Sequence, residues 1–368
     1  MAVKSFVVVF PSVFSRQYVP ALVRNIKRVL NLQNEPYTRV GRDGEVILVD
    51  AHDPVFASSA IGMLFGVEKV LIARQTENDF DGIVRLITEV GGNLLLKGDR
   101  FLVRVEGHSQ GFLPKDVEMS ATSSIIETKS SLGARPGTPD SHDKMLYAYM
   151  TRKNAYVSLF TDSGLGGLPN GIQGRAVSCI YDELSAVSCF EAIRMGFEVH
   201  IVACYRRDSD LTALAKILNR IIPRLLLAEV EIAFYHIHPE GTRYLDVAAL
   251  STELAVHEAA NRDIAHVVLP VSRMLFPGDA ADTLAARVAA SGRVPLVTLS
   301  GDYPALVRTL GELNLAGRRT AGLRSLISRR HAPPSETPPR PQRSLETRRV
   351  ISVRAGPNNL HDMLDSLR

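Results

Sequence analysis

The 368-residue sequence has no tryptophan, only three cysteines and no long uncharged apolar run. Cys179, Cys189 and Cys204 form neither an even-numbered disulfide set nor a Cys-x-x-Cys metal knuckle, which argues against a disulfide-stapled secreted domain. No window approaches the about 18 apolar residues of a membrane helix, and the apolar stretch before Pro11 is too short for a secretory signal. We therefore expect a cytoplasmic protein in a reducing compartment, with no membrane partner.

Metal-ligand patterns are also scarce. His236 and His238 could lie on one face of a strand, with Glu240 as a third ligand, as a metal site requires. A pair of histidines that simply satisfy their hydrogen bonds at the end of a strand explains the same spacing. We expect no metal site.

The positive charge is concentrated near the end of the chain. Residues 317–349 carry nine arginines against two glutamates, a local charge of +7, which leaves −3 for the rest of a chain whose formal total is +4. Five prolines and little apolar content are typical of a linker, so we predict disorder over 326–349. The arginines could contact RNA or could simply be solvated. In the C-terminal segment 350–368, an alternating apolar stretch could return to a sheet edge.

The pattern of apolar and turn residues over 1–75 predicts a ferredoxin-like domain. A strand precedes a helix over 15–32, two strands meet at an Asp43-Gly44 turn, and a further helix leads to a strand over 69–74. The polar face of the first helix carries only cations, which suits either RNA phosphates or solvent. These cations are Arg16, Arg24, Lys27 and Arg28.

Residues 76–172 predict a second α+β domain. The pattern gives a helix over 79–91, a half-buried strand over 101–105, a helix over 115–131 and a pair of strands. The domain ends in Gly-Leu-Gly-Gly-Leu-Pro-Asn-Gly, whose glycines predict positive φ or a close approach of another segment. The positions of this element are Gly164, Gly166, Gly167, Pro169 and Gly171.

Strands and helices alternate over 173–325. This alternation predicts a doubly wound, Rossmann-like parallel sheet whose ligand crevice lies beyond the carboxyl ends of the strands. Arg206 and Arg207 follow the second strand there, where they could hold phosphate or lie in a solvated loop. The predicted fold class is therefore α/β and α+β.

The order of these domains resembles the ThiI-type tRNA 4-thiouridine synthase (tRNA sulfurtransferase) family. The glycine-proline element is the most specific part, because the THUMP module of that family runs into the catalytic domain through a similar sequence. The resemblance covers about residues 1–315. It implies a THUMP domain over 76–172 that binds tRNA and a PP-loop ATPase-type domain over 173–325. It also implies tRNA thiolation, or sulfur transfer to the thiazole of thiamine, as the activity.

The ATP loop of the family has the pattern Ser-Gly-Gly-x-Asp-Ser. By this resemblance it aligns with residues 180–185 of this chain, where only Ser185 matches the pattern. Glycines in such loops let backbone NH groups wrap the phosphates at a helix N-terminus. Two acids stand there in this chain, and each would repel a polyphosphate by roughly 1–4 kcal/mol. We predict a degenerate loop whose acids cap the following helix. The loop residues are Ile180, Tyr181, Asp182, Glu183, Leu184 and Ser185.

The family also carries persulfide sulfur on a cysteine late in the α/β domain. This chain has no cysteine after Cys204. We predict Cys179 and Cys189 to be buried and inert, whereas Cys204 stands at the carboxyl end of a strand, where a ligand could reach it. The catalytic residues are otherwise unassigned.

Three functions remain open. The leading one is a noncatalytic or altered tRNA-binding protein that needs no cofactor. The alternative is an active sulfurtransferase that binds ATP and Mg²⁺ and adenylates uridine, with sulfur from a carrier protein; the third is a scaffold for a separate catalytic protein. The resemblance also implies a homodimer. The expected RNA contacts are Arg16, Arg24, Lys27, Arg28, Lys97, Arg104 and Lys115.

Overall fold

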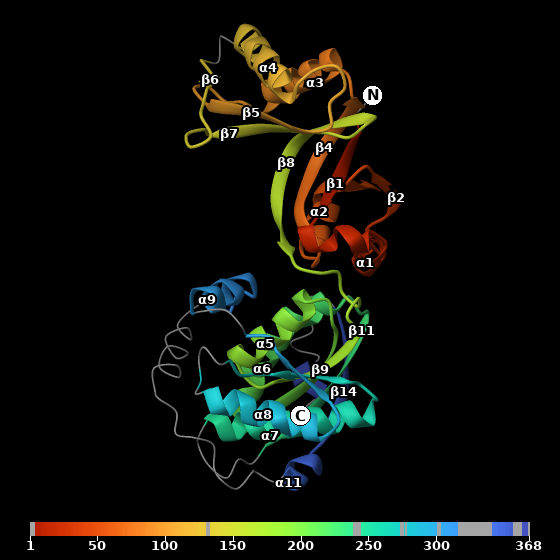
Figure 1. Ribbon diagram of the computed structural model, residues 1–368, viewed down its shortest axis with the longest axis vertical. Coiled ribbons are helices and arrows are strands. Elements are labelled where there is room, and N and C mark those ends of the chain that lie inside the picture. The colour runs from red at the N-terminus through yellow and green to blue at the C-terminus, as the bar shows by residue number, and fades with distance from the viewer. Residues whose placement is uncertain are drawn as a thin grey trace. The chain divides into compact units, whose positions relative to one another are not determined.

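The computed structural model describes the chain except for residues 1–3, 130–132, 238–243, 273–275, 277, 300–302, 316–340, 356–362 and 367–368. The chain forms two compact units, Met1–Gly167 and Leu168–Arg368. Figure 1 shows the elements of both. Among the described helices, none is long and apolar enough to cross a membrane.

Unit 1 is built on an eight-stranded sheet in the order β2-β3-β1-β4-β8-β7-β5-β6. β4 pairs with β8 along most of its length, so one sheet runs through both predicted N-terminal domains, and the division into 1–75 and 76–172 stays a prediction. The elements are β1 Ser5–Pro11, η1 Val13–Tyr18, α1 Val19–Leu32, β2 Tyr37–Asp43, β3 Val46–Ala51, α2 Pro54–Gly62, β4 Val67–Glu77, α3 Phe80–Leu94, β5 Arg100–Gly107, α4 Pro114–Lys129, β6 Arg135–Pro136, β7 Lys144–Met150 and β8 Asn154–Gly166.

Two pairs of helices cover different parts of this sheet. α1 packs on α2, which lies on β1 and β4, whereas α3 and α4 pack together over β5, β7 and β8. The apolar stripe of α1 is buried through Leu22, Ile26 and Leu30, as its helical spacing predicts. Under α3 and α4, Phe101 and Ile125 belong to a continuous core.

The opposite face of the sheet is partly closed by the curvature of the sheet itself. β8 bends as it runs from β4 towards β7 (Figure 1). Phe10 on β1 and Tyr149 on β7 therefore meet edge to face, with ring centroids 4.8 Å apart, although β4 and β8 separate these strands in the sheet. Val8, Leu71 and Tyr156 are buried in the same cluster, since alternate strand residues point away from the helices.

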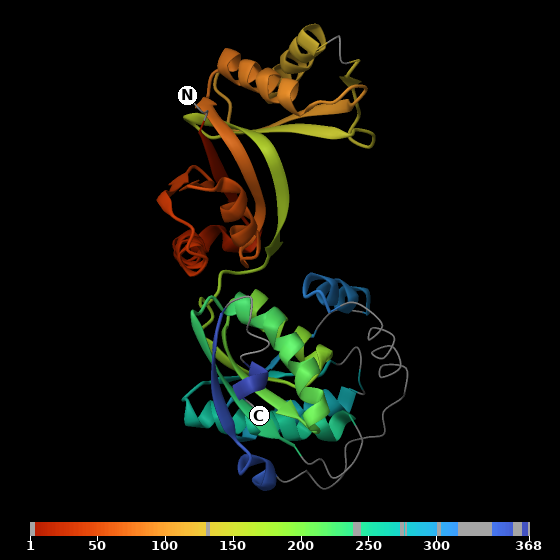
Figure 2. The ribbon, with the colours of Figure 1, turned by 180° about the vertical axis from the view of Figure 1, so that it is seen from behind.

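Unit 2 confirms the predicted doubly wound α/β fold. Its sheet has the order β13-β12-β9-β10-β11-β14, and every pairing is parallel except that of β14 with β11. α5 and α6 pack together on one face of the sheet, and α7 and α8 pack together on the other (Figure 2). The elements are β9 Arg175–Ile180, α5 Glu183–Arg194, β10 Glu198–Tyr205, α6 Asp208–Ile221, η3 Ile222–Leu225, β11 Glu229–His236, α7 Tyr244–Asn261, β12 His266–Leu269, α8 Gly278–Ala290, β13 Val294–Val297, α9 Tyr303–Glu312, α11 Gln342–Leu345 and β14 Arg349–Arg354.

The predicted disorder over 326–349 is wrong for its last residues. α11 and the start of β14 lie there, and β14 pairs with β11, which confirms that the final apolar stretch returns to a sheet edge. Thr347 Oγ1 accepts a hydrogen bond from the backbone NH of His236 at 3.0 Å. The prediction rested on arginine and proline content, which does not reveal a partner elsewhere in the chain. Residues 326–340 lie outside the described residues.

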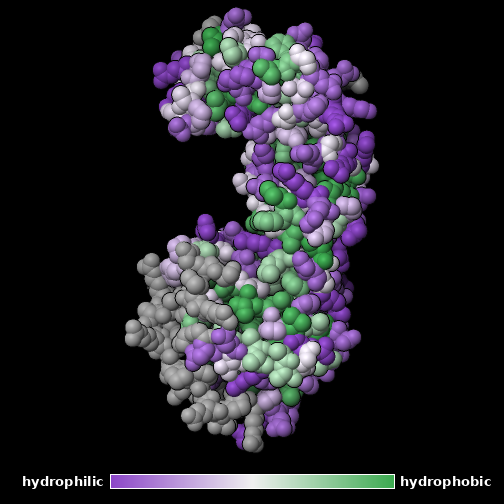
Figure 3. All heavy atoms as spheres, viewed as in Figure 1, coloured by the Kyte–Doolittle hydropathy of each residue, from purple (hydrophilic) through white to green (hydrophobic). Residues whose placement is uncertain are grey.

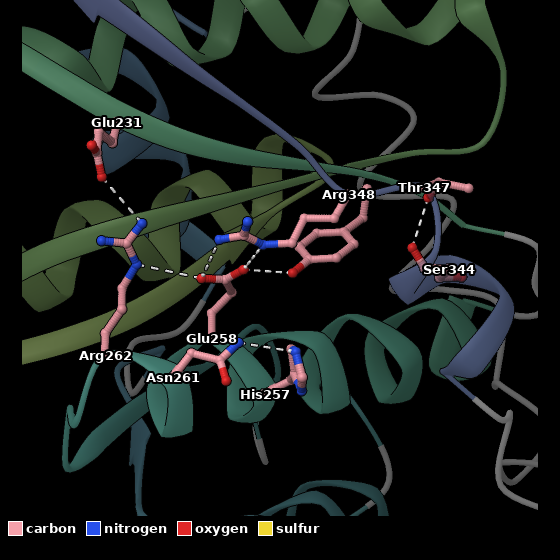
Figure 4. Close-up of polar contacts among 9 residues, drawn as sticks. Glu231, His257, Glu258, Asn261, Arg262, Ser344, Thr347 and Arg348 are labelled. Carbon is pink, nitrogen blue, oxygen red and sulfur yellow. Dashed lines mark hydrogen bonds and ion pairs between the residues drawn. The ribbon is translucent and has the colours of Figure 1, made fainter.

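The buried carboxylate of Glu258 on α7 holds this returning segment (Figure 4). Arg348 Nε donates to Glu258 Oε1 at 2.6 Å, the Tyr235 hydroxyl donates to the same oxygen at 2.5 Å, and Arg262 Nε lies 3.4 Å from Oε2. Burial opposes ionisation of Glu258, but the hydrogen bonds and the charge of Arg348 outweigh it and lower the pKa of the carboxyl to about 2. Glu258 therefore stays ionised and ties β14 to the unit.

Replacement of Arg348 tests this tie. We expect Arg348→Met to lower the free energy of unfolding by about 2–4 kcal/mol, because it leaves a buried carboxylate with weaker compensation. Arg348→Lys, which keeps the charge, should lose less. Urea unfolding followed by circular dichroism measures both, and a Met variant within about 0.5 kcal/mol of the unaltered chain would contradict the role given to Glu258.

Candidate functional site

The loop between β9 and α5 is where the sequence predicts a degenerate ATP site. Asp182 is the N-cap of α5, and its Oδ1 accepts a hydrogen bond from the Ser185 NH at 2.8 Å. In return, Ser185 Oγ accepts from the backbone NH groups of Tyr181 and Asp182, both at 3.0 Å. One NH group in the first turn of α5 and two NH groups of the loop before it thus already have an acceptor from the chain itself.

Aromatic side chains lie beside this cap. The Tyr181 hydroxyl donates to the Tyr244 hydroxyl at 3.2 Å, and the Tyr244 ring stacks on Phe276 with centroids 5.3 Å apart. Burial and the negative charge of Asp182 raise the pKa of both tyrosines well above the usual value. Burial also raises the pKa of Asp182, against the opposing effect of its hydrogen bonds with Ser185. The loop is therefore packed with the chain's own groups.

These residues do not fit a nucleoside triphosphate with Mg²⁺. A phosphate at a helix N-terminus needs unoccupied NH donors and a positive field. Here Asp182 takes the Ser185 NH, Ser185 takes two NH groups of the preceding loop, and the carboxylates of Asp182 and Glu183 add negative charge at the same position. By the predicted alignment, Tyr181 also stands where the family pattern has a glycine, which lacks a side chain.

Arg206 and Arg207 lie at the same edge of the sheet as this loop, because β9 and β10 are parallel neighbours. Both residues are exposed. The NH of Arg207 donates to Asp210 at 3.1 Å at the start of α6, and the carbonyl of Arg206 accepts from His236 Nε2 at 2.9 Å. Their role in holding phosphate stays a prediction.

The three cysteines are all buried. Cys204, expected within reach of a ligand, is only 1% exposed, and its sulfur lies 3.1 Å from that of Cys179. Burial raises the pKa of Cys189 to about 12 and that of Cys179 well above its usual value. The expected access to Cys204 is therefore not found, because the end of β10 is covered by its surroundings in unit 2.

The glycine-proline element is anchored at both of its ends. The carbonyl of Gly167 accepts from the hydroxyls of Ser12 and Ser15 at 2.6 and 3.0 Å. A Cβ at Gly164 would come within 2.2 Å of the Val67 carbonyl oxygen, so only glycine fits this close strand pairing. Beyond it, the NH of Gly171 donates to Gly196 O at 3.0 Å. This confirms the expected close approach.

The seven predicted RNA contacts differ in their surroundings. Arg16, Arg24, Lys27 and Arg28 are exposed on η1 and α1, and Lys97 is exposed beyond the end of α3. Arg104 and Lys115 are exposed too, but they form ion pairs with Glu106 at 3.2 Å and Glu118 at 2.9 Å. The structure therefore groups the first four and leaves their binding to RNA as a prediction.

Two of the three suggested metal ligands, His238 and Glu240, lie outside the described residues. Among the residues that are described, no group of three or more histidine, cysteine or acidic side chains could hold a metal ion.

Sequence reasoning missed two features. Gly107-His-Ser-Gln-Gly111 matches the Gly-x-Ser-x-Gly pattern of hydrolase nucleophiles, but α4 begins only at Pro114, so Ser109 is not on the sharp strand-to-helix turn that this chemistry needs.

The second feature is Asp43, which the sequence predicts only as a turn residue. Its carboxylate accepts three hydrogen bonds from residues more than 100 positions away, which no local pattern reveals.

The chain is 29% identical over 190 residues to a probable tRNA sulfurtransferase of Methanosarcina acetivorans and 28% identical over 193 residues to one of Methanosarcina mazei. The resemblance to the tRNA sulfurtransferases is confirmed. The matches cover 51% of this chain and 46–47% of these relatives, so the chain spans about half the length of the curated tRNA sulfurtransferases it matches. No family model matches it.

Solved structures support the same fold. A 4-thiouridine synthetase in complex with RNA and bound ATP aligns with a TM-score of 0.68, covering 95% of this chain and 99% of that one, at 15% identity. The protein PH1313 of Pyrococcus horikoshii aligns with a TM-score of 0.64, covering 85% of this chain and 100% of that one, at 16% identity. At such low identity these alignments establish the architecture and not the chemistry.

The cap at α5 can be tested by stability. We expect Asp182→Ala to lower the free energy of unfolding by about 1 kcal/mol, because it removes the acceptor for the Ser185 NH. Asp182→Asn keeps an acceptor oxygen without the charge that burial disfavours, so it should be at least as stable as the unaltered chain at pH 7. Thermal melts of both variants measure the difference.

The pH dependence supplies the control for this test. The folded pKa of Asp182 is raised above the usual 3.8, so its stabilising contribution is complete below that value and is lost as the pH rises through the folded pKa. The Asp182→Asn variant does not lose stability in this way. The difference between its free energy of unfolding and that of the unaltered chain should therefore grow as the pH rises from about 3.8. An advantage that shrinks with rising pH would contradict the raised pKa of Asp182.

Proposed function

We propose that this protein is a tRNA-binding relative of the tRNA sulfurtransferases whose α/β unit does not use ATP. The observation that carries the second part is the reciprocal cap between Asp182 and Ser185, which occupies one NH group of the first helical turn and two NH groups of the loop that a phosphate would need. The first part is supported by the curated relatives and by the related fold that was solved with RNA. The exposed cations of α1 supply phosphate contacts without base readout.

An active enzyme is the second candidate. It would bind ATP in a different pose through Arg206 and Arg207 at the carboxyl edge of the sheet, and a partner would deliver the sulfur. Burial of all three cysteines favours a partner as sulfur carrier in that case. The proposal also includes three further expectations from the resemblance. These are a role in forming the thiazole of thiamine, a homodimer, and a place in the cytoplasm together with the tRNA.

Calorimetry with ATP and Mg²⁺ tests the loop. We expect no dissociation constant tighter than about 1 mM, which corresponds to only about −4 kcal/mol. The triple variant Tyr181→Gly, Asp182→Gly, Leu184→Asp should bind ATP more tightly, because it frees the Ser185 NH, removes the Tyr181 side chain and moves the acid from position 182 to position 184, as in the family pattern.

The control for this test is Arg206→Ala/Arg207→Ala. Micromolar ATP binding by the unaltered chain that this double variant abolishes would replace the proposal by the enzyme alternative. Micromolar binding that survives it would also refute the closed loop.

Filter binding of folded tRNA to the full chain tests the RNA part. We expect binding that weakens steeply with salt as counterions are released, and at least a tenfold loss at low salt in Arg24→Glu/Lys27→Glu. Lys216→Glu/Arg220→Glu makes the same charge change on the exposed face of α6 and should have a smaller effect. Equal losses in the two double variants would show that only net charge matters.

A further inference from the structure

A carboxylate in unit 1 fastens two hairpins to each other. Asp43, at the tip of the β2–β3 hairpin, accepts hydrogen bonds at Oδ2 from Thr151 Oγ1 at 3.0 Å, Asn154 Nδ2 at 2.9 Å and the Tyr156 hydroxyl at 2.5 Å. These three donors belong to the β7–β8 hairpin. Thr151 and Tyr156 are buried and Asp43 is half-buried, so the contact is partly shielded from water. The two hairpin tips are therefore held in a fixed arrangement.

Two hollows flank this contact. One, of about 570 Å³, lies between the β2–β3 hairpin, the start of β1 and the start of β8; the other, of about 700 Å³, lies between the same hairpin and the ends of β5 and β7. Arg42 and Lys153 line both hollows. The two hollows thus form neighbouring parts of one surface, with Asp43 between them.

Exposed cations rim this surface. Arg39 and Arg42 come from the first hairpin and Arg152 and Lys153 from the second, and within the described part of the chain none of the four forms an ion pair. The acids that line the hollows are Asp43, Asp50 and Glu45. Asp43 is occupied by its three hydrogen bonds and Asp50 by Lys4 at 2.5 Å.

The rest of this side of unit 1 is hydrophilic as well. The space-filling view shows mostly hydrophilic residues where β2 and the tip of the β7–β8 hairpin lie (Figure 3). Such a surface offers no apolar patch of the kind that protein partners bury. It presents charge instead.

The chemistry of these cations favours phosphodiesters. Arginine presents a planar fork of donors that matches a phosphate bidentately and remains charged at every accessible pH, and three of the four cations are arginines. Arg42 uses Nε for the Gly44 carbonyl at 2.6 Å, which orients its guanidinium. Cations spread along two joined hollows fit a chain of phosphates better than a single small anion.

We propose that this hairpin surface, defined by Arg39, Arg42, Arg152 and Lys153, binds the phosphate backbone of the tRNA, with Asp43 as a positioning residue that keeps the two hairpins in register. The inference rests on the proposed tRNA binding and adds a surface distinct from the cations of α1. It also assigns a purpose to a half-buried carboxylate that joins segments far apart in the sequence.

The test compares double variants of the full chain by filter binding of folded tRNA across a salt series. We expect Arg42→Gln/Lys153→Gln to weaken binding about tenfold at low salt and to reduce the slope of log affinity against log salt by about 1–2, as loss of two phosphate contacts requires. Lys216→Gln/Arg220→Gln, with the same charge change on α6, should stay within about twofold of the unaltered chain. Circular dichroism and melting temperature verify the fold of each variant.

A variant that does not fold is replaced by Arg39→Gln/Arg152→Gln, for which the same losses are expected. Affinity and salt slope equal to those of the Lys216→Gln/Arg220→Gln control would overturn the inference. If Arg24→Glu/Lys27→Glu weakens binding while the hairpin variants do not, the hairpin surface is refuted and tRNA binding stands. If the unaltered chain does not bind tRNA at all, the proposed function fails and the hairpin surface with it.

Anionic membranes are the other polyanion that such a surface could meet. Flotation with phosphatidylserine vesicles provides this arm, with the unaltered chain and Arg42→Gln/Lys153→Gln run side by side. Vesicle binding that the variant loses, together with unchanged tRNA affinity, would assign the surface to lipid and overturn the inference. Loss of tRNA affinity without vesicle binding by the unaltered chain supports it.

Discussion

The reciprocal hydrogen bonds between Asp182 and Ser185 are the interaction on which the proposed loss of ATP binding by unit 2 depends. A doubly wound fold places its ligand crevice at the carboxyl ends of the strands, where helix N-termini offer NH donors. In this chain the Ser185 NH of α5 and two NH groups of the preceding loop already bind the Asp182 carboxylate and the Ser185 hydroxyl. A cap stabilises the helix whether or not a phosphate is present, so the proposed loss of the anion site is compatible with the fold.

In each unit, a carboxylate that accepts several hydrogen bonds connects segments that are far apart in the sequence. Asp43 joins two hairpins in unit 1, and Glu258 joins the C-terminal strand to α7 in unit 2. Each carboxylate can accept several donors at once, so one side chain fixes groups from distant parts of the chain. The cations left over on the surface of unit 1 are then available to an external polyanion, while Arg348 is committed to the fold.

The sequence predicts the local features of this structure well. The spacing of Leu22, Ile26 and Leu30 gives α1, the alternation beyond residue 173 gives the α/β unit, and the acids before Ser185 predict a capped helix. These features depend on neighbours within a few positions. A composition-based reading of arginines and prolines, in contrast, placed Arg348 in a disordered tail.

Contacts between distant segments could not be predicted in this way. Arg348 lies 90 residues from Glu258, and Asp43 lies 113 residues from Tyr156. Neither pair has a periodic or spacing signal, because only the folded sheet brings its members together. The burial of Cys204 was missed for the same reason: its place at a strand end is local information, but the groups that cover it are not.

The most direct test of the central claim is tRNA-dependent exchange of labelled pyrophosphate into ATP by the full chain. Adenylation of a uridine would leave pyrophosphate as the other product, so a working ATP loop must catalyse this exchange when tRNA is present. The closed cap at α5 predicts exchange no faster than in a mixture without the protein, even where filter binding shows that the tRNA is bound. Exchange that requires both the protein and tRNA would contradict the account and establish an active enzyme.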